Sequence, residues 1–109
     1  SLTILDLSNF DTNKVTNMGR MFQDCSNLLS LNMNNLNVNK VTNMVYGFAN
    51  CISFTSLNLN NWKLSGSAGL RYLFSNCKVN GVSVNRQNIA DWNWNTEDMT
   101  DIQFIQMFG

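Results

Sequence analysis

Hydrophobic and polar residues alternate in short stretches that recur along the chain at a fixed interval. In the first stretch Leu5 and Leu7 alternate with polar neighbours, and residues 30–34 and 56–60 repeat the pattern at intervals of 26 residues. Alternation with a period of two is typical of a short strand with one buried face. Residues 81–85 carry a weaker fourth copy. Because an interval of 26 residues rules out hairpin pairing, we expect these strands to stack as a parallel ladder.

A second apolar pattern follows each strand and indicates a short helix. Its copies span residues 15–25, 41–51 and 70–77, and Thr12 or Thr16 is placed to cap the first. In the third unit the segment 66–69 is rich in glycine, which predicts a looser turn and a frayed helix start. In the first unit the apolar residues have helical spacing, and they are Val15, Met18, Met21, Phe22 and Cys25.

The two patterns belong to one internal repeat. Residues 13–18 return unchanged as residues 39–44. A period in this range is typical of a solenoid. We therefore expect an α/β repeat solenoid, a leucine-rich-repeat-like coil with one short parallel strand and one short helix per 26-residue turn, here called a rung. The chain should form a single fragment of about four rungs, part of a longer array, with the divisions 1–27, 28–53, 54–78 and 79–109.

The fourth unit departs from the repeat. Relative to the first unit it carries an insertion of seven residues, which ends at Trp94, the counterpart of Phe10 and Trp62. Residues 95–99 then predict a helix start capped by Thr96. We expect the apolar stripe of this helix to continue from Met99 through Ile102, Ile105 and Phe108.

Charge and hydropathy exclude several classes of function. The net charge is zero, which argues against a nucleic-acid or membrane-surface binder, although residues 1–90 carry +4 and residues 91–109 carry −4. No apolar run reaches the length of a membrane span, and Ser1 leads directly into a strand pattern without a signal peptide.

The residues available for catalysis or metal binding are few. The chain has no histidine, and its three cysteines, Cys25, Cys51 and Cys77, occupy one repeat position. That spacing favours a ladder of buried thiols over a disulfide with one free thiol, and it lacks the close pairs of a zinc site. Calcium binding is an alternative reading of four acids, although helix capping explains two of them more simply; they are Asp91, Glu97, Asp98 and Asp101. We expect no enzyme activity, cofactor or metal.

Two sets of residues are candidate partner contacts. The outward rows of the strand ladder contain Asn32 and Asn58 in one row, and Asn34 and Asn60 in the next. These amides either solvate the face and bond to one another along the ladder or form a recognition surface for a protein or a glycan.

The second set lies in the insertion, which contains Arg86, Trp92 and Trp94. The tryptophans either pack in the core or contact a partner, because aromatic side chains are enriched at interfaces. Insertions in repeat arrays often lie on the binding face, so we expect a partner to engage this loop before the asparagine rows.

The repeat resembles a known family. The pattern Leu-x-x-Leu-Asp-Leu-Ser-Asn-Phe-Asp-Thr-x-Lys-Val-Thr-Asn-Met-x-x-Met-Phe-x-x-Cys, read from Leu2 to Cys25, resembles the BspA-like or DUF285 repeat of mycoplasma and lactobacillus surface proteins. The resemblance implies a leucine-rich-repeat-like solenoid on a secreted or cell-surface protein, with a role in adhesion or protein contact and no enzymatic activity.

Together these observations favour a non-catalytic protein-interaction or adhesion module. The expected partner is a protein or a glycan, and the expected location is extracellular or at the cell surface. The alternative is a structural linker or scaffold subunit, held at the periphery of a larger multi-protein assembly.

Overall fold

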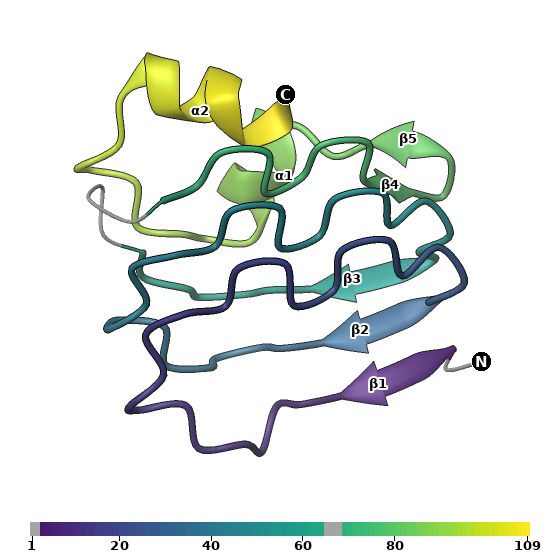
Figure 1. The fold of residues 1–109 in the computed structure, drawn as a ribbon, viewed down its shortest axis with the longest axis horizontal. Coiled ribbons are helices and arrows are strands. Elements are labelled where there is room, and N and C mark those ends of the chain that lie inside the picture. Colours follow the sequence, from purple (N-terminus) through teal and green to yellow (C-terminus); the bar gives the residue numbers. More distant parts are fainter. Residues whose placement is uncertain (1–2, 65–68) are drawn as a thin grey trace.

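A three-stranded parallel sheet forms one side of the molecule. The computed structural model describes residues 3–64 and 69–109, and its first strands are β1 (Ile4–Asp6), β2 (Ser30–Asn32) and β3 (Ser56–Asn58). They lie side by side in the order β1-β2-β3, and all three point the same way (Figure 1). Leu5 pairs with Leu31 and Leu31 with Leu57, so the register advances by one 26-residue repeat per strand.

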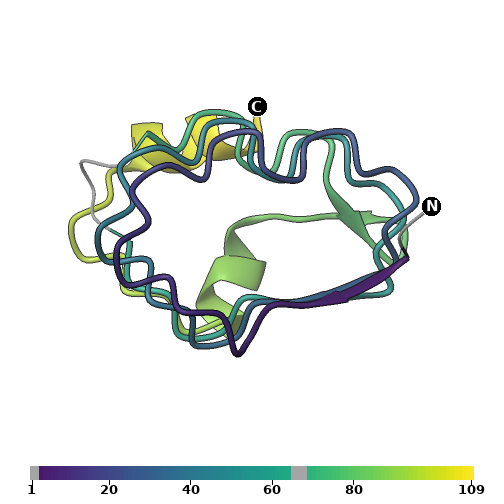
Figure 2. The ribbon, with the colours of Figure 1, turned by 60° about the horizontal axis from the view of Figure 1, so that its bottom comes forward.

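A second parallel ladder joins the rungs on the opposite side. Asn17, Asn43 and Gly69 form bridges across successive rungs. Viewed nearly along the stack, the rungs superimpose (Figure 2). Along residues 18–24 of the first rung, every second backbone N–H donates to the next rung at 2.8 to 2.9 Å. The donors are Met18, Arg20, Phe22 and Asp24, and the acceptors are the carbonyls of Asn43, Val45, Gly47 and Ala49.

The helices expected after each of the first three strands are absent. Residues 15–25 and their copies at 41–51 and 70–77 form consecutive turns. Arg20 and Asp24 have φ values of 59° and 64°, which a right-handed helix cannot contain. Alternate N–H groups bond to the neighbouring rung instead of to the fourth preceding carbonyl, so the expectation of one helix per rung is wrong. The spacing of the apolar residues marks successive turns that bury Met18 and Phe22.

The core fills the space between the two ladders. The rings of Phe22, Phe48 and Phe74 stack one above another, and Leu31 and Leu57 face them from the sheet side. Phe10 is the exception among the repeated anchors, because it is 63% exposed whereas its counterparts Leu36 and Trp62 are buried. The first rung lacks a neighbour on its outer side in this structure, and Phe10 lies on that rung.

The fourth unit begins with a hairpin. Strand β4 (Lys78–Val79) pairs antiparallel with β5 (Val82–Ser83). Asn80 and Gly81 connect them with φ values of 52° and 77°, as the tightest hairpin turns require. Val79 contacts the ladder at Phe54, whereas Val82 and Ser83 are exposed. The expectation that residues 81–85 form the fourth strand of the ladder is therefore wrong, because the Asn-Gly turn reverses the chain.

Helix α1 (Arg86–Asp91) occupies the insertion and covers the end of the core. Asn85 caps it, and Ile89 is its buried residue. Within the view of Figure 2 the helix lies inside the outline of the stacked rungs. The chain then rejoins the ladder, where Asn95 bridges to Lys63 at an offset of 32 residues.

Helix α2 (Asp101–Phe108) takes the place of the next set of turns. The N–H groups of Tyr72 and Phe74 donate to the carbonyls of Gln106 and Met107 at 2.8 and 2.9 Å. The helix is capped by Thr100, not by Thr96 as expected from the sequence.

The apolar stripe expected for this helix is also wrong. Phe104 and Met107 are buried, whereas Ile102 and Ile105 are 66% and 70% exposed. With 3.6 residues per turn, Phe104 and Met107 share one face of the helix, and Ile102 and Ile105 project from the other side. The looser turn expected at residues 66–69 falls mainly on residues 65–68, which lie outside the described residues.

Candidate functional site

Two columns of left-handed residues run along the outer side of the turns. On the turn side of each of the first three rungs the backbone takes a positive φ at two places four residues apart. The first column contains Arg20, Tyr46 and Tyr72, with φ values of 59°, 60° and 59°. The second contains Asp24, Asn50 and Asn76. Both columns keep the 26-residue period of the repeat.

The second column suits its backbone. Asparagine and aspartate tolerate the left-handed conformation better than other side chains with a Cβ. Their side chains also bond between rungs: Asn50 Nδ2 donates to Asp24 Oδ1 at 2.7 Å, and Asn76 Nδ2 donates to Asn50 Oδ1 at 3.1 Å. A similar ladder joins Asn35, Asn61 and Asn93. The chain's 20 asparagines are thus partly explained by backbone geometry.

The side chains of the first column are unusual for a left-handed backbone conformation. Arginine and tyrosine gain nothing from the left-handed conformation, which costs an L-residue about 1 to 2 kcal/mol. Such strain persists only where the surrounding structure holds it, and it is concentrated at functional sites. Arg20, Tyr46 and Tyr72 are therefore candidates for functional residues.

These residues form a continuous stack on the surface. The rings of Tyr46 and Tyr72 lie 4.9 Å apart with an interplanar angle of 21°. The Arg20 guanidinium lies 4.5 Å from the centre of the Tyr46 ring, and the Arg71 guanidinium lies 5.5 Å from the centre of the Tyr72 ring. We call these four residues the Arg–Tyr column. Tyrosine and arginine are among the residues that dominate binding energy at protein interfaces.

A polar hollow of about 390 Å³ adjoins the column. It is lined by residues of the first two rungs, namely Asn17, Gly19, Arg20, Asn43 and Val45. Arg20 is thus shared between the column and the hollow.

The tryptophans predicted from the sequence as candidate partner contacts in the insertion lie in the core. Trp92 and Trp94 are both buried, and their rings stack at 5.8 Å. Trp94 also stacks on Trp62 at 5.4 Å, and its indole N–H donates to the Leu59 carbonyl at 2.8 Å. Of the two alternatives for these tryptophans, core packing agrees with the structure, and the expectation that one of them is exposed to a partner is wrong, because both indoles are buried at the end of the core.

Arg86 is exposed but engaged. Its guanidinium lies 4.0 Å from the centre of the Phe104 ring and forms an ion pair of 3.1 Å with Asp101. Both charged groups are largely exposed, so the pair contributes little stability. The contact with the Phe104 ring is therefore the main link that Arg86 makes between α1 and α2.

The predicted asparagine rows are half-buried and bonded. Asn32 Oδ1 accepts from the N–H of Asn34 at 3.1 Å, and Asn34 Oδ1 accepts from the N–H of Asn60 at 3.0 Å. Asn58 Nδ2 donates to Ser56 Oγ at 3.2 Å. These bonds give the asparagine rows a structural role.

The cysteines are unpaired, as expected, but they differ in burial. Cys51 and Cys77 are buried, whereas Cys25 is half-buried. Burial, together with the adjacent Cys25 thiol, raises the pKa of Cys51 to about 12, and burial also raises the pKa of Cys77. A thiolate nucleophile is therefore disfavoured at both buried positions.

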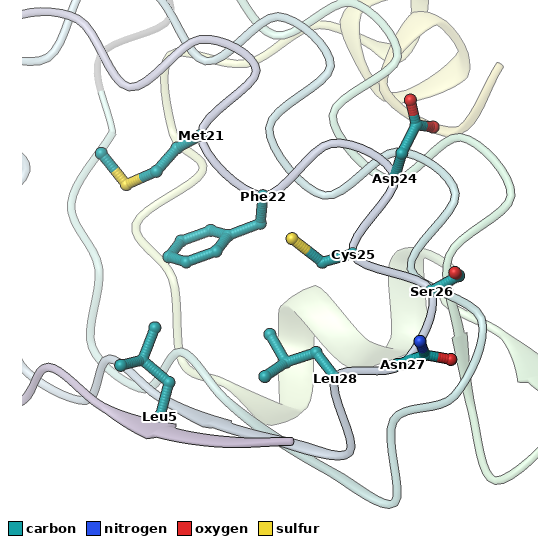
Figure 3. A pocket seen from close by; sticks show the side chains of 8 residues that line it. All are labelled: Leu5, Met21, Phe22, Asp24, Cys25, Ser26, Asn27 and Leu28. Atoms are coloured by element: carbon teal, nitrogen blue, oxygen red, sulfur yellow. The ribbon is translucent and has the colours of Figure 1, made fainter. Parts of the chain in front are cut away.

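Cys25 lines an apolar hollow of about 420 Å³ at the outer face of the first rung (Figure 3). Phe22 points into the hollow from the turn side, and Leu5 from β1 and Leu28 face it from the sheet side. A second apolar hollow of about 290 Å³ on this face is lined by Leu7, Phe10 and Met21, among others. In later rungs the equivalent space is filled by the preceding rung, so the hollows mark an uncovered end of the stack.

The four acidic residues considered as calcium ligands do not form a cluster in the structure. Asp101 pairs with Arg86, and Asp91 Oδ1 accepts from Gln87 Nε2 at 3.0 Å. Within residues 3–64 and 69–109 no three acidic, cysteine or histidine side chains come close enough to hold a metal ion. Over the same residues no helix has the length and apolar character needed to cross a membrane.

Sequence reasoning missed the Arg–Tyr column. The signal was present, since Arg20, Tyr46 and Tyr72 recur at the 26-residue interval. The expectation of a helix over these segments concealed it, because a helix has no left-handed position at which a large side chain would be notable.

Comparison with known proteins gives one match. A family model described as "Mycoplasma protein of unknown function, DUF285" matches residues 1–109. No curated protein and no solved structure matches the chain.

Proposed function

The chain belongs to the DUF285 family, and from this premise we propose that it is a non-catalytic protein-interaction module whose contact surface is the Arg–Tyr column. The observation that carries the proposal is the column itself. Arg20, Tyr46 and Tyr72 recur at the 26-residue interval and all have a positive φ, which is a strained conformation for large side chains. The neighbouring column has the same backbone conformation but contains only aspartate and asparagine. The strain is understandable if the side chains are selected for contact.

The proposed architecture is a leucine-rich-repeat-like solenoid of about four rungs within a longer array. The 26-residue register of both ladders supports it. So does the apolar character of the uncovered outer face of the first rung. In such a fold each rung presents equivalent positions at a constant spacing, which suits an extended contact surface.

The proposed location is extracellular or at the cell surface, in an adhesion role. This part rests on the resemblance of the repeat to those of bacterial surface proteins. The non-catalytic character is supported by the raised pKa of the two buried thiols and by the dispersal of the acids.

A second candidate is a structural linker or scaffold subunit in a larger assembly. The apolar hollows on the outer face of the first rung favour it, because such a surface is suited to burial against another structural unit.

Selection from a random peptide library on the immobilised chain tests the primary proposal. We expect the selected peptides to lose at least about tenfold in affinity for a Tyr46→Gly, Tyr72→Gly variant, because truncating an interface anchor costs about 2 kcal/mol or more. Glycine tolerates positive φ, so this variant should fold, which circular dichroism would verify.

The matched control is Asn32→Ala with Asn58→Ala on the strand face, where affinity should be retained. Peptides that bind the tyrosine variant as tightly as the native chain would contradict the proposal. Failure to select any specific peptide would favour the structural linker.

A further inference from the structure

The polar hollow beside Arg20 presents hydrogen-bond donors. Asn17 Oδ1 accepts from the Gly19 N–H at 2.8 Å, and Asn43 Oδ1 accepts from the Val45 N–H at 2.9 Å. A backbone N–H can donate to the side-chain oxygen but not to the amide nitrogen, so these bonds fix the orientation of both amides. Neither side-chain NH₂ group has a hydrogen-bond partner in the described part of the chain, and each remains available to an acceptor.

Gly19 keeps the hollow open. A Cβ at this position would lie 2.9 Å from Asn43 Oδ1, too close unless that side chain shifts, and 3.1 Å from Asn17 Oδ1, a tight contact. Any larger residue would displace the two amides. The hollow of about 390 Å³ therefore depends on a glycine between two fixed asparagines.

The cations of the column lack carboxylate partners. Arg20 Nη1 donates to Gln23 Oε1 at 3.0 Å, a neutral acceptor. Throughout residues 3–64 and 69–109 the sole ion pair is Arg86 with Asp101, so Arg20 and Arg71 have none. The nearby Asp24 carboxylate accepts from Asn50 instead. Two exposed guanidinium groups thus flank the tyrosine pair without neutralisation.

The stacking geometry disfavours a sugar platform. Tyr46 is flanked by Arg20 and Tyr72, and Tyr72 is flanked by Tyr46 and Arg71. Each tyrosine ring covers one face of the other, and a guanidinium lies over each ring, which leaves little ring face on which a sugar could stack. The column presents ring edges, phenol groups and guanidinium N–H donors to a partner. Together these groups are suited to bind an anionic hydrogen-bond acceptor that lies next to an apolar group.

We infer that the Arg–Tyr column and its hollow bind the carboxylate side chains of an acidic, extended peptide segment of a partner protein. The inference rests on the proposed function and adds the chemistry of the partner. One carboxylate enters the hollow and accepts from Arg20 and from the amides of Asn17 and Asn43. A second pairs with Arg71, and charge-assisted bonds of this kind are stronger than neutral ones.

Titration with a peptide of four Glu-Gly repeats tests the inference, with a peptide of four Gln-Gly repeats as the neutral counterpart. Measured by calorimetry at low ionic strength, the native chain should bind the glutamate peptide at least about tenfold more tightly, and added salt should weaken binding. Arg20→Gln with Arg71→Gln should abolish that preference. Arg86→Gln, which removes an arginine outside the column, should preserve it.

A second variant isolates the hollow. Gly19→Ala should weaken binding of the glutamate peptide several-fold while both arginines remain, and circular dichroism would show that the fold persists. Equal binding of the two peptides, or an unchanged preference in the double arginine variant, would overturn the inference. Tighter binding of an oligogalacturonate would assign the carboxylates to a sugar and would overturn it as well.

The library selection separates this inference from the proposed function. If the selected peptides require Tyr46 and Tyr72 but are not acidic, the partner chemistry is wrong and the interaction function stands. If they bind without the two tyrosines, the proposed function itself fails.

Discussion

The rings of Phe22 and Phe48 are parallel to within 2° at a centroid distance of 5.6 Å. Phe48 is in turn 5.5 Å from Phe74, with an interplanar angle of 9°. The same repeat position therefore forms a continuous aromatic stack through three rungs. Because each ring is covered by its neighbours, the stability of one rung depends on the presence of the next.

Truncation of the middle ring should be costly. Phe48 is 1% exposed, and Phe48→Ala should lower the free energy of unfolding by about 3 to 5 kcal/mol, as measured by urea denaturation. Phe10→Ala serves as the control, because this exposed phenylalanine should contribute less than about 1 kcal/mol. Similar losses in the two variants would contradict the stacked core.

The three thiols should react at different rates with an aromatic disulfide reagent. Cys25 is half-buried in the outer hollow, whereas Cys51 and Cys77 are buried. We expect one thiol to react in the native chain and all three after denaturation. Recovery of only one thiol under denaturing conditions would reveal a disulfide and refute the ladder of free cysteines.

Stability should fall at alkaline pH partly through Cys51. Burial raises its pKa from about 9 to about 12, so the folded state favours the neutral thiol. That contribution is fully present below about pH 9, the ordinary value, and is lost as pH rises toward about 12. Cys51→Ala should therefore show a shallower decrease in unfolding free energy over this interval. Parallel pH profiles for the two proteins would argue against the buried thiol as a cause.

Backbone strain at Tyr46 can be measured directly. With φ at 60°, alanine at this position keeps the strain, whereas glycine relieves it. Tyr46→Gly should be more stable than Tyr46→Ala by about 1 kcal/mol in thermal or urea unfolding. The same pair of substitutions at Thr42, whose φ is not positive, should favour alanine. Equal stability of the two Tyr46 variants would show that the backbone at this position is not strained, and backbone strain would then no longer support a functional role for Tyr46.

Tryptophan fluorescence should show that the tryptophan side chains at the end of the core are shielded from solvent. Trp62, Trp92 and Trp94 are all buried. Quenching by acrylamide should be several-fold weaker in the native chain than in the denatured one. Strong native quenching that disappears in Trp92→Phe would return this residue to the surface, where the sequence alone allowed it to be placed.

The strand side of the fold could be predicted because its signals are local and in phase. Leu5, Leu31 and Leu57 alternate with polar residues, and the repeat interval fixes their register. The turn side could not be predicted in the same way. Met18 and Phe22 are four residues apart, which fits both a helix and a pair of turns. Bonds to a neighbouring rung decided between them, and such bonds are invisible in the sequence of one rung.

The Arg–Tyr column could not be predicted from the sequence either, because its residues are unusual only in the folded backbone. Trp92 and Trp94 were prominent in the sequence because large aromatic residues are frequent at interfaces, but the same size makes them suitable to close a core. Tyr46 and Tyr72 were recognisable only once the left-handed backbone was known. The Asn80-Gly81 dipeptide is typical of a two-residue hairpin turn, and this signal in the sequence indicates the chain reversal that the weak strand pattern of residues 81–85 does not.

The hydrogen bonds of both ladders run along the direction in which the rungs are stacked, and this has a mechanical consequence. A force that pulls the uncovered end of the stack away from the helix-covered end acts on the rung interfaces in series, so the weakest interface opens first and the others follow one after another. Each released rung of 26 residues lengthens the chain by up to about 90 Å. Under tension the molecule would extend in discrete steps, and rungs whose interfaces have not yet opened would keep their structure.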